Sequence, residues 1–373
     1  MKTIYLDNSA TTRQYDEVTD IMVKMFKEDF GNPSSMHGLG VTAEKAVRKA
    51  RKQVADKLGA LEEEIFFTSG GTEADNTAIF GAAHARKRRG NKIITTAVEH
   101  PAVLEAFKRL EEEGFEAIYL PVDRECHVDM EAYKQALSDD VIFISVMTVN
   151  NEIGTIQPIR EMYDMKPEGA IFHTDAVQAF GKVEVPLTDL ISVSGHKIHG
   201  PKGIGALYIK KGTVIEPFMV GGGQEKHMRS GTENVPGIVG FGLAAELCGK
   251  GDVKRVKERL RNGILSEIKD IRINTPEEDS ADSILNVSFL GTRSEVILHR
   301  LEQDGIFVSA GSACSSNKKG RSHVLTSMKM KDEEIDGAIR FSFSEFNTVE
   351  EMDFVTDRVK NAVAEFRRLG SFR

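Results

Sequence analysis

Short apolar runs alternate with segments of helical periodicity along most of the chain, and this order limits the possible folds more than any other feature. The clearest apolar runs are Ile65–Thr68, Lys92–Thr95, Ala117–Leu120, Val141–Val149, Ala170–Phe172 and Leu190–Val193. The long run Val141–Val149 is typical of a central strand that is buried on both faces. Strands that are joined through helices form a parallel sheet with helices on both of its faces. We therefore predict an α/β fold with a mostly parallel sheet.

The length of 373 residues is enough for two domains. We place the large domain, which would hold the sheet and its flanking helices, at residues 15–245. A smaller α/β domain would combine residues 1–14 with residues 246–373. In this second part the alternation continues through the strand Ile284–Phe289, the helix Ser294–Gln303 and the strand Ile339–Phe343.

Composition excludes several classes of protein. The formal net charge of −8 argues against a protein that binds nucleic acid or an anionic membrane. The sequence has no apolar run long enough for a transmembrane helix, and its first residues lack the apolar core of a signal peptide. The cysteines Cys126, Cys248 and Cys314 are widely spaced and odd in number, which favours a reducing cytoplasm over a disulfide framework. No CxxC pair is present, so we expect no structural metal site.

Polar residues follow the predicted strands where each strand ends. In parallel sheets, ligands bind at the carboxyl ends of the strands. The polar residues at these ends are Thr72, His100, Asn151, Asp175, Gln178, Ser194, His196 and Lys197. Because these ends meet along one edge of a sheet, we expect the side chains to converge on a single site.

Lys197 stands in the glycine-rich stretch Ser194–Gly205, between two apolar runs. One interpretation is a surface turn with a solvated lysine, which is the usual environment of lysine. The other is a desolvated lysine with a lowered pKa, whose amine attacks a carbonyl group. The neighbouring Ser194 and His196 favour the second interpretation.

A glycine pair and a hydroxyl residue follow the strand Ile65–Thr68, in the stretch Ser69–Asn76 that opens a helix. This arrangement offers backbone N–H groups and a helix N-terminus to an anion such as a phosphate. It matches neither the Walker A loop nor the dinucleotide fingerprint. The alternative is a plain turn in which glycine relieves backbone strain.

Pyridoxal phosphate needs a lysine, a phosphate cradle and a carboxylate for its ring nitrogen. Lys197, the loop at Gly71 and Thr72, and Asp175 can supply these three groups. His100 stands where its ring could stack on the cofactor or move protons. The alternative for His100 is a histidine at a helix start that bonds only to the backbone.

The motifs of the chain occur together in the order known from one family. They are Tyr5–Thr12, Gly31–Ser35, Thr68–Glu73, Glu99-His100, Asn150–Gly154, Thr174–Gln178, Ser194–Gly205, Arg229–Thr232 and Ile339–Phe343. With these motifs the chain resembles the group I cysteine desulfurases, a class V branch of the fold-type I pyridoxal-phosphate enzymes. The resemblance covers nearly the whole chain.

The resemblance implies a role for each matching residue. Lys197 would carry the cofactor, Asp175 would meet the ring nitrogen and Gln178 the ring hydroxyl, while His100 would stack on the ring. The cofactor phosphate would be held by Gly71, Thr72, Ser194, His196 and the partner subunit's Thr232. Asn151 and Arg340 would hold the substrate carboxylate, and Asn151 would also contact the cofactor. A planar guanidinium such as that of Arg340 pairs well with a carboxylate.

Cys314 distinguishes the possible reactions. It lies in Ser309–Gly320, a stretch of small residues and lysines. A lone cysteine can be an inert buried thiol, but nearby lysines favour the reactive thiolate. The stretch resembles the group I loop that delivers the catalytic cysteine, whereas Cys126 and Cys248 match no catalytic motif.

The activity implied by the resemblance is a homodimeric L-cysteine desulfurase of the cytoplasm. It would convert L-cysteine into L-alanine and place the sulfur on Cys314 as a persulfide. An acceptor protein would receive this sulfur for iron–sulfur clusters or other thio-cofactors. Two alternatives keep the cofactor, a class V aminotransferase and a selenocysteine lyase, and a third is a degenerate scaffold that only binds.

One segment departs from the family. Between Asp175 and Lys197 the chain is shorter than the family usually is, with Val185–Leu190 in place of a longer turn. We expect a trimmed surface turn, because the motifs on both sides are intact. If the lysine strand were displaced, activity would be lost.

Overall fold

The computed structural model describes residues 3–310 and 321–370, and the side chains of residues 3–310 and 321–368. Its larger sheet has seven strands in the order β2-β8-β7-β6-β5-β3-β4. These strands are β2 (Ile65–Thr68), β3 (Lys92–Thr96), β4 (Glu116–Leu120), β5 (Val141–Ser145), β6 (Ile171–Asp175), β7 (Leu190–Ser194) and β8 (Gly205–Ile209). Only β8 runs against the others, since it pairs antiparallel with both β2 and β7. The predicted mostly parallel sheet is confirmed.

Helices cover both faces of this sheet. On one face, α3 (Gly71–Arg86) and α4 (Pro101–Glu112) pack against inward side chains such as Phe143 and Leu207. The other face is covered by α1 (Asp16–Lys27), α2 (Gly38–Leu58), α5 (Met130–Ala136), α6 (Ile159–Met165) and α7 (Val235–Leu247). Alternate residues of each strand serve opposite faces, and the central strand β5 is therefore buried along its whole length.

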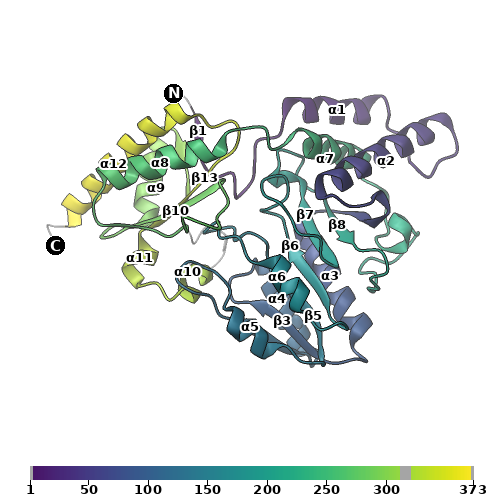
Figure 1. The fold of residues 1–373 in the computed structure, drawn as a ribbon. Coiled ribbons are helices and arrows are strands. Elements are labelled where there is room, and N and C mark those ends of the chain that lie inside the picture. Colours follow the sequence, from purple (N-terminus) through teal and green to yellow (C-terminus); the bar gives the residue numbers. More distant parts are fainter. Residues whose placement is uncertain (1–2, 311–320, 371–373) are drawn as a thin grey trace.

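A second, antiparallel sheet lies beside the first and has the strand order β12-β13-β10-β9 (Figure 1). Its strands are β9 (Ile271–Ile273), β10 (Ile284–Phe289), β12 (Ser309–Ala310) and β13 (Ala338–Ser342). The helices α8 (Val253–Glu267), α9 (Ser294–Gln303) and α12 (Val349–Gly370) supply the apolar residues of its core. The short α10 (His323–Ser327) and α11 (Asp332–Asp336) lie between β12 and β13 in the sequence.

The N-terminal segment belongs to this second core. The strand β1 (Ile4–Tyr5) pairs in parallel with β11 (Ile306–Phe307), and both Ile4 and Leu6 are buried in the core of the antiparallel sheet. The chain then passes to α1 over the larger sheet (Figure 1). Residues 7–12 therefore lie between the two sheets.

The strand predicted over Val141–Val149 is shorter than expected, since β5 ends at Ser145. The backbone N–H of Met147 donates to Oε1 of Glu99 at 3.0 Å, so this N–H bonds to a side chain and not to a neighbouring strand. The following residues remain buried because they lie beneath the carboxyl edge of the sheet. The prediction that Val141–Val149 is buried is confirmed, whereas the predicted length of the strand is wrong.

Within residues 3–310 and 321–370, no helix combines the length and the hydropathy that a membrane crossing requires.

Candidate active site

One edge of the larger sheet collects most of the polar residues that the sequence singled out. The strand β6 ends at Asp175 and β7 ends at Ser194, directly before the short 3-10 helix Gly195–Lys197. The strands pair in register, with Asp175 opposite Ser192. The short segment between Asp175 and Lys197 therefore leaves β7 beside β6, as expected for a trimmed turn.

An open pocket lies at the N-terminus of α3, and we call it the cradle pocket. It is lined by Thr11, residues 69–73, Ser194, His196, Lys202 and Gly203. Four residues that the sequence assigned to a phosphate, Gly71, Thr72, Ser194 and His196, therefore meet here. The first backbone N–H groups of a helix attract an anion, and Lys202 adds a positive charge.

Two glycines allow the backbone around the cradle pocket to pack closely. A Cβ atom on Gly71 would lie 2.7 Å from Cγ2 of Val177, and one on Gly205 would lie 2.5 Å from the carbonyl oxygen of Val193. The strand β8 can thus pass close to the loop at Gly70, because its first residue, Gly205, has no side chain. The hydroxyl of Ser194 is buried and has no hydrogen-bond partner in the described residues.

Lys197 is half-buried, and the N-terminal segment holds its ammonium group. Nζ donates hydrogen bonds to the carbonyl oxygens of Ser9 and Ala10, the second at 2.8 Å. Gln178 also donates to the carbonyl oxygen of Ser9, at 2.9 Å. A single backbone carbonyl therefore joins the predicted lysine to the predicted partner of the ring hydroxyl.

Asp175 and His100 form the buried titratable part of the site. Asp175 is 6% exposed, and its Oδ1 accepts a hydrogen bond from the backbone N–H of Val177 at 2.9 Å. Burial raises the pKa of Asp175, while a protonated His100, the hydrogen bond from Val177 and the charge of Lys197 oppose this rise. With His100 neutral, the hydrogen bond and the Lys197 charge are the influences that favour the carboxylate form.

His100 caps α4. Its Nδ1 accepts a hydrogen bond from the N–H of Ala102 at 3.1 Å, so the neutral ring carries its proton on Nε2. Burial lowers the pKa of His100. His100 therefore bonds to the backbone at the start of a helix, which was one of its two interpretations. This bond fixes the orientation of the ring and leaves Nε2 for a ligand.

His196 is also held by the N-terminal segment. Its Nδ1 lies 3.2 Å from Oγ1 of Thr11. Burial, with a smaller effect of the Lys197 charge, lowers the pKa of His196 to about 4. The ring is therefore neutral near pH 7 and can donate one hydrogen bond to a ligand in the cradle pocket.

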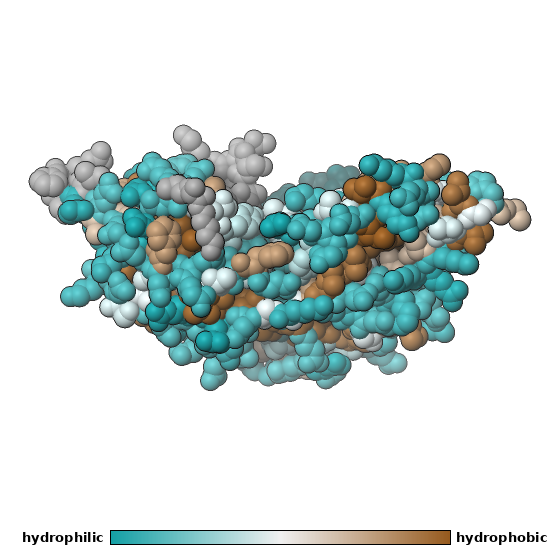
Figure 2. Space-filling model, turned by 90° about the horizontal axis from the view of Figure 1, so that it is seen from above, coloured by the Kyte–Doolittle hydropathy of each residue, from teal (hydrophilic) through white to brown (hydrophobic). Residues whose placement is uncertain are grey.

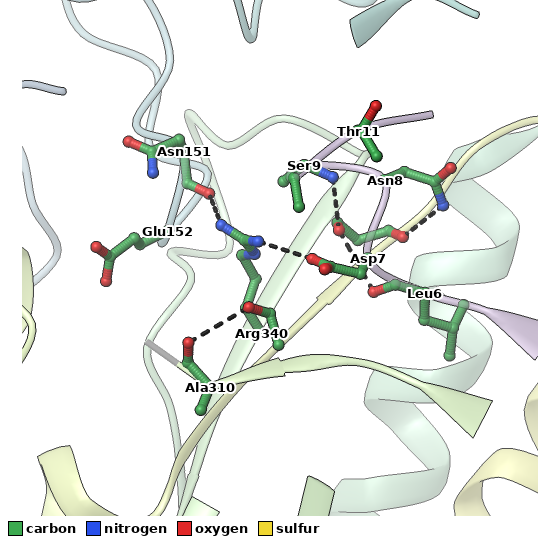
Figure 3. Close-up of polar contacts among 12 residues, drawn as sticks. Leu6, Asp7, Asn8, Ser9, Thr11, Asn151, Glu152, Ala310 and Arg340 are labelled. Atoms are coloured by element: carbon green, nitrogen blue, oxygen red, sulfur yellow. Dashed lines mark hydrogen bonds and ion pairs between the residues drawn. The ribbon is translucent and has the colours of Figure 1, made fainter. Parts of the chain in front are cut away.

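Arg340 lies on β13 of the antiparallel sheet, beside the N-terminal segment that also contacts Lys197 (Figure 3). The residue is 3% exposed. Its Nη2 pairs with Oδ1 of Asp7 at 2.8 Å, and its Nη1 donates to the carbonyl oxygen of Asn151 at 2.9 Å. Nε is buried without a partner in the described residues. The structure thus brings the Arg340 side chain to the backbone of Asn151, and the role of both in binding a substrate carboxylate stays a prediction.

Comparison with known proteins places this site in a family. Residues 4–355 match the family described as Aminotransferase class-V. The chain belongs to the class-V aminotransferases. These enzymes use pyridoxal phosphate, and the fold of the chain is that of the NifS-like members, fold-type I.

Close relatives of this class-V chain carry a specific name. A protein of Clostridium botulinum named cysteine desulfurase IscS is 44% identical over 381 residues, which cover 99% of this chain and 96% of the relative. A solved structure titled NIFS-LIKE PROTEIN has a TM-score of 0.91 and 38% identity, and covers 97% of this chain and 100% of its own. Another, titled SspA in complex with cysteine, has a TM-score of 0.84 and 32% identity, with coverages of 93% and 100%.

The residues present fit the cofactor of the class-V family. The buried Ser194 hydroxyl, unpartnered in the described residues, can donate to a phosphate oxygen beside the N-terminus of α3. A buried carboxylate such as Asp175 is stabilised by a cationic partner, which a protonated pyridine nitrogen would provide. Both observations come from polar groups that a bound pyridoxal phosphate would satisfy.

Two predicted residues remain to be placed relative to the site. Cys314 lies outside the described residues. Thr232 is exposed and was expected to act in the site of a partner subunit. Its neighbour Arg229 pairs with Glu73 at 2.9 Å, which ties the Arg229–Thr232 loop to the first turn of α3.

Sequence reasoning missed the residues around the predicted ones. The polar run Asp7–Thr12 belongs to a family motif, but its sequence alone predicts no role in the site. In the structure it contacts four predicted site residues: Lys197, His196, Gln178 and Arg340. Its density of polar side chains immediately after a short strand was the available signal. The buried carboxyl groups of Asp75 and Glu99 were also missed, since acidic residues at helix starts and strand ends usually face solvent.

Proposed function

We propose that this protein is a pyridoxal-phosphate-dependent L-cysteine desulfurase, which converts L-cysteine into L-alanine and transfers the sulfur to Cys314 as a persulfide. The observation that carries the proposal is the arrangement of the cradle pocket, Asp175 and Lys197 along one sheet edge. The N-terminal segment links this edge to Arg340, because Asp7 pairs with Arg340 and Ala10 accepts a hydrogen bond from Lys197. The full-length relative named cysteine desulfurase supports it.

In this proposal the cofactor is attached through Lys197. Gly71, Thr72, Ser194 and His196 hold the phosphate, and the partner subunit's Thr232 completes the cradle. Asp175 pairs with the ring nitrogen, Gln178 with the ring hydroxyl, and His100 stacks on the ring, with Asn151 beside it. When bound, the cofactor supplies an electron sink for the substrate bond that breaks.

The residues of the chain perform the remaining tasks. Arg340 and Asn151 hold the substrate carboxylate, which orients the amino acid. The Lys197 amine and the His100 ring are placed to move protons, since His100 is neutral with its proton on Nε2. The contacts of Ser9 and Ala10 keep Lys197 at the site while it is not bonded to the cofactor.

The sulfur step is balanced without an added oxidant. The Cys314 thiolate attacks the substrate sulfur, a sulfur–sulfur bond forms and the Cβ–S bond breaks. The electron pair of that bond, with protons, completes the methyl group of alanine, so one thiol becomes a persulfide while L-cysteine becomes L-alanine. A thiolate suits this attack, whereas a serine hydroxyl does not.

The proposed enzyme is a homodimer of the cytoplasm. Apolar side chains are exposed on α1 and on the segment that leads to α2, among them Val23, Phe26, Phe30 and Met36. Figure 2 shows hydrophobic residues on the surface of the half of the molecule that these helices cover. A surface of this kind is typical of an interface. The two described cysteines are unpaired, which supports a reducing compartment.

The proposed domain boundaries remain 15–245 for the large domain and 1–14 with 246–373 for the small one. The separate apolar cores of the two sheets support this division. Sulfur would pass from Cys314 to an acceptor protein that serves iron–sulfur clusters or other thio-cofactors. A class V aminotransferase or a selenocysteine lyase would need the same cofactor but not the transfer of cysteine sulfur to Cys314.

The test is to incubate the pure protein with L-cysteine and a thiol and to assay sulfide and alanine. We expect equal amounts of both, and an added sulfur on the peptide that contains Cys314 by mass spectrometry. Cys314→Ser should bind L-cysteine with a spectral change but release almost no sulfide. Lys197→Ala should lose both the visible absorbance of the bound cofactor and the turnover.

Sulfur on Cys126 or Cys248 would contradict this assignment. Both are buried, and burial raises the pKa of each thiol, so neither is disposed to form a thiolate. Wild-type sulfide release by Cys314→Ser would also contradict it. 3-Mercaptopyruvate in place of alanine and sulfide would instead favour an aminotransferase, because transamination removes the amino group and leaves the carbon–sulfur bond intact.

A further inference from the structure

Asp7 pairs with the guanidinium group of Arg340, and the proposed function assigns the substrate carboxylate to this same group. We propose that Asp7 is an internal competitor for Arg340, holding its guanidinium while no amino acid is bound and thereby limiting the affinity of the site for the substrate carboxylate. This inference rests on the proposed function, in which Arg340 binds the carboxylate of an amino acid. Asp7 acts through Arg340, so it is a positioning residue.

The contact between the two side chains is short but single. Oδ1 of Asp7 lies 2.8 Å from Nη2 of Arg340, while Nε of Arg340 has no partner in the described residues (Figure 3). A guanidinium can bind a carboxylate through two parallel hydrogen bonds, which is stronger than one contact. The Asp7 pair therefore leaves part of the hydrogen-bonding capacity of Arg340 to an incoming ligand.

The backbone of Asp7 is fixed, so only its side chain can move away. The N–H of Ser342 donates to the carbonyl oxygen of Leu6 at 2.7 Å, and Nδ2 of Asn8 donates to the carbonyl oxygen of Ser342 at 2.8 Å. These contacts hold both neighbours of Asp7 against the end of β13. The Asp7 side chain is nevertheless 22% exposed, against 4% for that of Arg340. The carboxylate can thus turn toward solvent while the guanidinium stays buried.

The charge balance explains why such a partner is needed. A buried guanidinium without a counter-ion is strongly destabilising, so Asp7 stabilises the protein when the site holds no amino acid. A substrate carboxylate at the same guanidinium would be repelled by Asp7, because like charges at close range oppose each other. Asp7 therefore stabilises the ligand-free protein at the expense of ligand affinity.

The neighbouring Glu152 does not supply the same charge. Its carboxyl group is buried and accepts a hydrogen bond from the Ser322 hydroxyl at 2.6 Å. Burial raises the pKa of Glu152 to about 7, although Ser322 and Arg340 oppose the rise. Among the described residues, Asp7 is the acidic residue whose side chain pairs directly with Arg340.

The test compares two ligands on the protein loaded with pyridoxal phosphate. L-Alanine carries the carboxylate without the sulfur, and ethylamine is the same amine without the carboxylate. Asp7→Asn removes the charge at nearly constant size. We expect it to lower the dissociation constant of L-alanine about tenfold, within the usual range of coupling between two groups. The dissociation constant of ethylamine should stay unchanged.

A second readout follows the stability of the protein. Without ligand, Asp7→Asn should melt below the wild type, because Arg340 has lost its counter-ion. Saturating L-alanine should narrow this gap, whereas ethylamine should not. If Asp7→Asn does not fold, Asp7→Ser provides the same comparison. The matched control is Asp353→Asn, which removes a surface carboxylate paired with Arg259 at 2.6 Å and should leave both dissociation constants unchanged.

The possible failures are distinguishable. If folded Asp7→Asn binds L-alanine equally or more weakly, or if both ligands bind more tightly by the same factor, the competition by Asp7 is overturned. Arg340→Ala tests the premise, and it should weaken L-alanine binding without affecting ethylamine. If Arg340→Ala leaves L-alanine binding intact, the assignment of Arg340 in the proposed function fails, and the inference fails with it.

Discussion

His173 lies among buried titratable groups beneath the candidate active site. Its Nδ1 lies 2.8 Å from Oγ of Ser145 and its Nε2 lies 2.9 Å from Oγ of Ser192, while Oδ1 of Asp75 is 3.6 Å from Nε2. Burial lowers the pKa of His173 to about 3. Burial and the Asp175 charge raise the pKa of Asp75. His173 is therefore neutral near pH 7, and the rise in the pKa of Asp75 reduces the negative charge beside Asp175.

This environment predicts a pH dependence of stability. Between pH 6.5 and about 3 the unfolded chain gains a proton on His173 that the folded protein does not, so stability falls as the pH falls. One such proton contributes up to about 1.4 kcal/mol per pH unit. In denaturant unfolding of the apoprotein, His173→Gln should therefore show a shallower loss of stability below pH 6.5 than the wild type.

The range above pH 6.5 provides the internal control, because His173 is mostly neutral there in both states. Burial raises the pKa of Glu99 from 4.5 to about 8, so the folded protein keeps a proton that the unfolded chain releases, and this contribution to stability is lost as the pH rises toward 8. His173→Gln should leave the slope between pH 6.5 and 8 nearly unchanged. An identical acid slope in variant and wild type would show that His173 becomes protonated in the folded state.

At the scale of the elements, the cradle pocket depends on how closely β8 passes beneath the start of α3. Gly205 is the first residue of β8 and pairs with Thr68 on one side and Ser194 on the other. A side chain there would meet the backbone of both neighbours, since its Cβ would lie 2.5 Å from the Val193 oxygen and 2.8 Å from the carbonyl carbon of Gly70. Backbone atoms cannot yield as a flexible side chain can.

Gly205→Ala should therefore destabilise the protein by about 1–3 kcal/mol, which is typical of overpacking. It should also weaken the binding of pyridoxal phosphate, because the strand would push the loop at Gly70 outward. Gly38→Ala is the matched control, because a Cβ there meets nothing within 4 Å at the start of α2. We expect that control to be neutral or slightly stabilising. Chemical denaturation and a fluorescence titration with the cofactor measure the two effects.

At the scale of the whole molecule, the N-terminal segment joins the two sheets at the site. Leu6 lies in the core of the antiparallel sheet, and Ser9 accepts hydrogen bonds from Lys197 and Gln178 beside the larger one. Arg340 lies on β13 of the antiparallel sheet, and Lys197 lies directly after β7 of the larger sheet. The relative position of the sheets therefore sets the distance between the substrate anchor and the attachment residue of the cofactor.

The proposed dimer makes a prediction at the same scale. If the partner subunit's Thr232 completes each cradle, a Lys197→Ala chain mixed with a Thr232→Ala chain should regain activity. In a mixed dimer, one of the two sites has both an intact lysine and an intact threonine. We expect up to about a quarter of wild-type activity after the subunits are unfolded and refolded together, since random pairing makes half of the dimers mixed.

The control is the same mixture without subunit exchange, which should show only the activities of the separate variants. Light scattering should find a dimer at the assay concentration. Activity of a monomer, or no recovery in mixed dimers that light scattering and mass spectrometry have verified, would contradict a shared site.

The sequence by itself was sufficient for the order of strands and helices, for the mostly parallel sheet and for the strand-end positions of Asp175, Ser194 and Lys197. These features are local: apolar periodicity reports burial, and a polar residue after a buried strand must lie at the sheet edge. Tertiary structure alone decided that β8 runs against its neighbours, that β5 stops at Ser145, and that Asp7 holds Arg340. Each of these depends on a contact between segments far apart in the sequence, and no local pattern determines which partner a strand or a charge will meet.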